Sequence, residues 1–188
     1  MKAYKFTRPN MTSKWGNLGP WVVGEWREVN GPLELCDNGL HCYPSAEVAT
    51  LMDCHDARYG RYSRLWRCEY EGEALGEENG LKLCVRRLRL IEKVPARWYT
   101  AEELVRIAIA STARVLFPGL IPVYETWAAK WLSGKDRSAE AARVASNIYA
   151  VADAFAYAAR AAAYAAYAVA KPIDFAAIIR DVTPRREQ

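Results

Sequence analysis

Long apolar runs are absent from this sequence. Its longest weakly charged stretch, residues 161–170, directly follows Arg160. It is too short to cross a bilayer, which takes about 20 apolar residues in a helix. Near the N-terminus, Lys2, Lys5 and Arg8 interrupt the apolar segment that a signal peptide requires. We therefore expect a soluble intracellular protein that makes no contact with a membrane.

Histidine is scarce, and the cysteines are poorly spaced for metal. The chain has five cysteines and two histidines, and no two cysteines form the C-x2-C pair of common zinc sites. Five residues of types that can bind zinc lie close together in the sequence: Cys36, His41, Cys42, Cys54 and His55. Adjacent residues in a strand, such as 41 and 42, point to opposite faces, and no third residue orients a Cys–His pair for nucleophilic catalysis. We expect no metal site, no cofactor and reduced, buried thiols.

A marked excess of either charge is also missing. Residues 1–95 carry 14 basic and 13 acidic side chains, and residues 96–188 carry 12 and 9. A dedicated DNA-binding domain usually has a clear basic surplus that is clustered on one face. These totals argue against a protein devoted to DNA, although they are compatible with a local basic patch.

The first half of the chain has the alternation of a β domain. Residues 1–95 contain short polar–apolar repeats separated by turn residues, which predicts a small, mostly antiparallel sheet. The apolar positions of residues 81–94 change parity at Arg86–Arg87, which predicts a β-bulge there. In the chemically densest stretch, residues 36–49, a turn and a short strand precede Ser45, which can cap a short helix.

The second half, residues 96–188, has the composition of helices, so the expected fold class is α+β. Thr100 and Glu103 form a capping box at the start of the first helix. Alanine makes up 17 of the 33 residues from 138 to 170, and its high helix propensity predicts one long helix there. We expect the larger side chains of this helix to contact a second copy of the chain or another protein, with an intramolecular core as the alternative. These side chains are Val144, Ile148, Val151, Phe155, Tyr157 and Tyr164.

A candidate binding loop precedes the longest predicted strands. Arg58, Arg61 and Arg64 recur at every third position, with Tyr59 and Tyr62 between them. Guanidinium groups match phosphate geometry and tyrosine rings stack on bases, so nucleic acid is a candidate partner. The alternative is an exposed loop whose arginines pair with the nearby glutamates.

Four motifs follow one another in the first half of the chain: Tyr4–Phe6, Cys36–Cys42, Arg67–Glu73 and the strand that ends at Glu92. In order and spacing they resemble an uncharacterised domain family that is common in phage and prophage genomes. The resemblance implies a phage or prophage accessory protein in the host cytoplasm, with the virion as the alternative location. It implies no chemical mechanism, so we expect a non-enzymatic protein that acts by binding macromolecules or by assembly.

A second, fainter similarity concerns residues 39–49. Their strand and Ser-started helix look similar to part of the ADP-ribosyltransferase fold. That resemblance implies an enzyme acting on a nicotinamide dinucleotide, with His41, Tyr43 and Glu69 as its catalytic candidates. The chain departs from the pattern, because its first strand has no His-Gly pair and no glutamate is clearly placed.

Three glutamates on one predicted strand give a further acid/base candidate. Glu69, Glu71 and Glu73 share one strand face at spacings of about 7 Å. Such spacing suits a pair of catalytic carboxylates, and it is equally typical of a solvated strand face.

Overall fold

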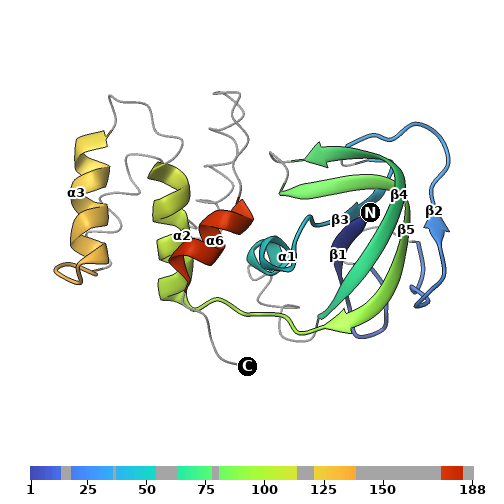
Figure 1. The fold of residues 1–188 in the computed structure, drawn as a ribbon, viewed down its shortest axis with the longest axis horizontal. Helices are drawn as coiled ribbons and strands as arrows, with labels where there is room; N and C mark the ends of the chain where they lie inside the picture. The colour runs from blue at the N-terminus through green and yellow to red at the C-terminus, as the bar shows by residue number, and fades with distance from the viewer. Residues whose placement is uncertain are drawn as a thin grey trace. The chain divides into compact units, whose positions relative to one another are not determined.

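The computed structural model describes residues 1–13, 18–35, 37–53, 63–77, 81–113, 121–138 and 175–183. The chain divides into two units, Met1–Tyr99 and Thr100–Gln188. In the described part of the chain, the first unit holds a five-stranded sheet with a helix, and the second holds helices (Figure 1). The predicted α+β class is confirmed.

The described residues of the first unit form five strands and one helix. They are β1 (Lys2–Thr7), β2 (Arg27–Glu28), β3 (Leu40–Cys42), α1 (Ala46–Asp53), β4 (Arg64–Glu77) and β5 (Lys82–Val94). All pairings between these strands are antiparallel, in the order β1-β4-β5-β2, and β3 also pairs with β5. Residues 21–29 contribute little to the sheet. Only β2 and a bridge from Val23 to Leu90 form there, since Gly24 has a φ of 85° and turns the chain.

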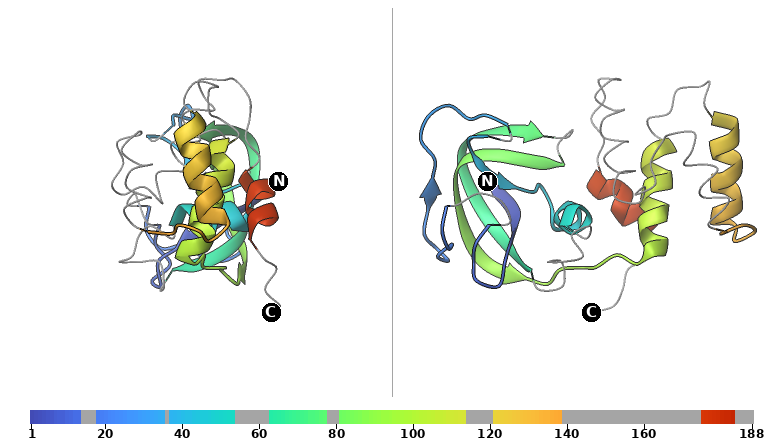
Figure 2. Two further views of the ribbon diagram at one scale, coloured as in Figure 1. Left: turned by 90° about the vertical axis from the view of Figure 1, so that its left-hand side faces the viewer. Right: turned by 180° about the vertical axis from the view of Figure 1, so that it is seen from behind.

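A seam between β1 and β3 closes the sheet into a small barrel. The N–H of Tyr4 donates to the carbonyl of Tyr43 at 2.8 Å, and the N–H of Tyr43 donates to that of Tyr4 at 2.7 Å. Since β3 also pairs with β5, the strands form a ring in the order β1, β4, β5 and β3. Figures 1 and 2 show the long strands β4 and β5 curving around β1 and β3.

The interior of the barrel is filled by one hydrophobic cluster. Trp21, Leu40, Trp66, Leu88 and Leu90 are among its buried members. The two indole N–H groups are satisfied: Trp66 donates to the hydroxyl of Thr7 at 3.0 Å and Trp21 to that of Ser13 at 2.8 Å. The core is therefore packed and its aromatic polar atoms are paired, as buried groups must be.

Helix α1 packs against the opposite face of β1. Ala46 and Ala49 lie in a second cluster with Phe6 and Leu65, and the rings of Phe6 and Trp98 are 5.9 Å apart. Figure 1 and the right-hand view of Figure 2 place α1 beside β1 on the side away from β2. The Oγ of Ser45 accepts from the N–H of Val48 at 3.2 Å, so the predicted cap is confirmed.

The β-bulge predicted at Arg86–Arg87 is confirmed in its position along the hairpin. The extra residue, however, belongs to the partner strand β4. Glu71 pairs with Arg87 and Ala74 pairs with Val85, so two residues of β4 stand opposite Arg86 alone. One of the two is Gly72, whose φ of 82° is strained for other residues.

The second unit contains α2 (Ala101–Ala113), α3 (Ile121–Leu132) and α6 (Phe175–Val182). Thr100 and Glu103 form the predicted capping box: the N–H of Thr100 donates to Glu103 Oε2 at 2.8 Å, and the N–H of Glu103 donates to Thr100 Oγ1 at 3.2 Å. Side chains of α2 and α3 share a small cluster that includes Val105, Ile109 and Trp131. The predicted Ala-rich helix lies outside the described residues. Among those that are described, no helix is long and apolar enough to cross a membrane.

Candidate functional site

Tyr43, a predicted catalytic residue, is part of the barrel wall. Its main chain makes both hydrogen bonds of the seam with Tyr4. Its partly buried side chain packs against the cluster formed by Phe6, Ala49 and Leu65. The tyrosine therefore joins the sheet to helix α1.

The predicted catalytic histidine and glutamate stand far apart on the sheet. His41 pairs with Cys84, and Glu69 pairs with Arg89, so their partners are five residues apart on β5. At the usual strand rise this separation is roughly 16 Å along the strand. The structure does not bring all three candidates to one point, because His41 and Tyr43 lie two residues apart at β3 whereas Glu69 lies on β4.

Glu69 is held in an ion pair across the sheet. Its Oε2 accepts from Arg89 Nη2 at 2.6 Å and from Nε at 3.1 Å. These hydrogen bonds lower the pKa of the Glu69 carboxyl below its usual value. A carboxylate with a lowered pKa is a weaker base, so this environment does not favour general-base chemistry.

The ion pair is one rung of a ladder on the outer face of the sheet, which we call the outer ladder. The Arg67–Glu92 pair has a 2.6 Å contact, and the Glu71–Arg87 pair has a 2.7 Å contact. Two guanidinium carbons, those of Arg87 and Arg89, each lie 4.5 Å from the ring centroid of Trp26. The indole thereby fixes the residue before β2 onto β5 through cation–π contacts.

The spacing of Glu69, Glu71 and Glu73 predicts a solvated or catalytic row of carboxylates, and it does not predict the ion pairs of Glu69 and Glu71 with arginines of β5. A signal was present, because an antiparallel hairpin over residues 64–94 places glutamates of one strand opposite arginines of the other. Locating the rungs required the register, which depends on the bulge at Gly72. No sequence pattern predicts the contact of Trp26 with β5, because this contact depends on the turn at Gly24.

A buried lysine inside the barrel was also missed. Lys5 is 7% exposed, and its Nζ donates to the carbonyl of His41 at 2.6 Å. The same ammonium lies 5.3 Å from the ring centroid of Trp21, and the guanidinium carbon of Arg27 lies 4.4 Å from that centroid. Arg27 also donates to the carbonyls of Gly19 and Pro20. These cations hold Trp21 and its loop on the barrel.

The chemically dense stretch of residues 36–49 has structural roles wherever it is described. Asn38 Nδ2 donates to the carbonyls of Asn30 at 2.8 Å and Pro32 at 2.6 Å. Gly39 lies so close to Cys84 that a Cβ at this glycine would stand 2.1 Å from the sulfur. The Asn38 hydrogen bonds stabilise the turn that precedes β3, and the close approach of Gly39 to Cys84 packs the start of β3 tightly against β5.

The described cysteines, Cys42, Cys68 and Cys84, have buried thiols. Burial raises the pKa of Cys42 to about 12 and that of Cys68 to about 12. Neither thiol is therefore a ready nucleophile. No group of three or more His, Cys, Asp or Glu side chains among the described residues is placed to hold a metal ion. Cys36, Cys54 and His55 lie outside those residues.

Most of the predicted binding loop and all of the predicted interface lie outside the described residues. This applies to Arg58, Tyr59, Arg61 and Tyr62, and to the six side chains between 144 and 164. The described member of the loop set, Arg64, begins β4, and its Nη1 lies 3.8 Å from the sulfur of Met11. Arg64 is therefore anchored beside the first loop of the chain.

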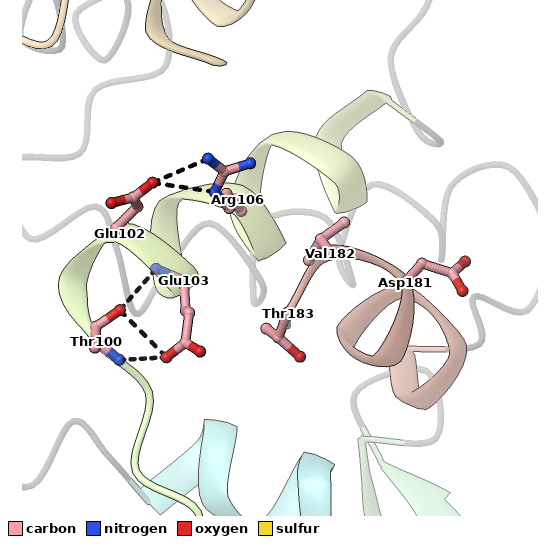
Figure 3. Close-up of a pocket in the computed structure, with 7 residues that line it drawn as sticks. All are labelled: Thr100, Glu102, Glu103, Arg106, Asp181, Val182 and Thr183. Carbon is pink, nitrogen blue, oxygen red and sulfur yellow. Dashed lines mark hydrogen bonds and ion pairs between the residues drawn. The ribbon is translucent and has the colours of Figure 1, made fainter. Parts of the chain in front are cut away.

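A pocket of about 500 Å³ lies in the second unit, between the start of α2 and the end of α6 (Figure 3). Glu103 serves the helix cap, and Glu102 accepts from Arg106 at 2.9 Å and from Arg137 at 3.3 Å. The lining residues are Thr100, Glu102, Glu103, Arg106, Asp181, Val182 and Thr183. Most of these residues have polar side chains, and Glu102 and Glu103 stabilise the start of α2.

Comparison with known proteins places the first unit in a family. No curated protein and no solved structure matches the chain. Residues 1–102 match the family described as "Domain of unknown function (DUF7666)". This match spans the barrel, helix α1 and the first residues of α2. The chain belongs to the DUF7666 family.

Proposed function

We propose that this protein is a non-enzymatic phage or prophage accessory protein that acts by binding another macromolecule or by assembly. The phage context rests on the resemblance of the four motifs in residues 1–95. It implies the host cytoplasm, or the virion, as the place of action. The mode of action rests on the structure of the first unit and on the pattern of the Ala-rich segment.

The observation that carries the proposal is the closed, filled barrel. An enzyme of the ADP-ribosyltransferase type needs a cleft beside residues 41 and 43 to admit a dinucleotide. Here Tyr43 is bonded to Tyr4 across the seam, and Leu40 and Cys42 on either side of His41 are buried in the core. Glu69 is engaged by Arg89 on the outer face. This arrangement is more typical of a scaffold that binds a partner on its surface than of an enzyme that encloses a substrate.

The outer ladder is a surface suited to a protein partner. Tryptophan and arginine are enriched where proteins meet, and here Trp26, Arg87 and Arg89 lie together. Each arginine already has a glutamate beside it, so the charges on this face largely cancel. A nucleic-acid interface instead carries unpaired positive charge along the backbone path. A protein partner is therefore our first choice, and the loop from Arg58 to Arg67 is the place where a nucleic-acid partner would bind.

Assembly through the predicted helix of residues 138–170 is the part of the proposal that can be tested without knowing the partner. Alanine buries little apolar area, so association must be driven by the larger side chains, among them Ile148 and Phe155. At 1.5 Å per residue the helix would be about 50 Å long, longer than a domain of about 95 residues is wide.

The test is light scattering on the intact chain and on the double variant Ile148→Arg/Phe155→Arg. We expect the intact chain to self-associate at high micromolar concentration and the double variant to be a monomer. The control, Ala154→Arg/Ala161→Arg, adds the same charge to a face of the predicted helix that lies between the apolar stripe and the tyrosines, and it should still associate. A monomeric intact chain would refute self-association and leave only a different partner. Saturable binding of a nicotinamide dinucleotide, lost in His41→Ala, would instead favour the enzyme.

A further inference from the structure

We draw no further inference here: the strongest candidate, the pocket between the start of α2 and the end of α6, carries nothing because Glu103 serves the helix cap, Glu102 pairs with Arg106 and Arg137, and no second observation in the described residues points to a ligand.

Discussion

The two faces of β4 and β5 differ sharply although they share the same strands. Leu88 and Leu90 point into a filled core, while Arg87 and Arg89, one residue away from each, lie on the outer ladder. The inner face removes apolar area from water and supplies most of the stability. The outer face consists of half-exposed ion pairs, which contribute little to stability because solvent screens them. Partner recognition on the outer face is therefore compatible with a fold maintained by the inner one.

The largest expected effect comes from truncating the inner face. Leu88 is 0% exposed, so Leu88→Ala should lower the free energy of unfolding by about 2–5 kcal/mol, since it removes buried methyl groups and leaves a cavity. The matched control is Arg87→Ala on the next residue, whose side chain is 39% exposed. That change should cost less than about 1 kcal/mol. Urea unfolding monitored by tryptophan fluorescence gives both values, and equal costs would contradict the assignment of the faces.

A smaller loss of stability is expected from a substitution at Gly39, where the chain lies against β5. Gly39→Ala places a methyl group against the sulfur of Cys84, and such overpacking costs about 1–3 kcal/mol. Cys84→Ala removes the sulfur, so it should relieve much of this cost when the two changes are combined. A double-mutant cycle on unfolding free energies measures the coupling. Strict additivity would show that Gly39 is needed for another reason.

The smallest effect concerns the buried thiols at alkaline pH. The pKa of Cys68 is raised to about 12 in the folded protein by burial, from a usual value of 9.0. Between these values the unfolded chain loses the thiol proton while the folded chain keeps it, so stability falls as pH rises from 9 towards 12. At pH 10 one such thiol costs about 1 kcal/mol relative to pH 8.

The measurement for the thiol compares the wild type with Cys68→Ala. Urea midpoints at pH 8 and pH 10 give the loss of stability in each protein. The variant lacks one titrating thiol and should lose less than the wild type over this interval, whatever its stability at pH 8. The same loss in both proteins would mean that Cys68 is ionised as easily in the folded state as in the unfolded one.

Local patterns were enough to predict much of the fold. The cap at Ser45 and the capping box of Thr100 and Glu103 each depend on neighbouring residues, and both are present. The parity change near Arg86 also located the register shift. These features follow from short-range chemistry that is readable in any isolated segment.

The features that the sequence did not reveal depend on contacts between distant strands. Lys5 looks like an exposed polar residue of an alternating strand, and it is buried because both faces of β1 are covered. The catalytic hypothesis for His41, Tyr43 and Glu69 assumed an open sheet, and barrel closure depends on a seam between residues 39 positions apart. Registers and closure of this kind are long-range properties that local patterning does not determine.

Amide hydrogen exchange at the seam between β1 and β3 measures whether the barrel is closed. The N–H groups of Tyr4 and Tyr43 hold β1 and β3 together. If the barrel is closed, both amides should be protected to the same order as those of Leu88 and Leu90 in β5, because they open only when the core opens. Exchange at rates near those of an unstructured peptide, with β4 and β5 still protected, would mean that the sheet is split beside Tyr43. A split sheet would contradict the closed barrel, and it would leave room beside Tyr43 for the cleft that an enzyme requires.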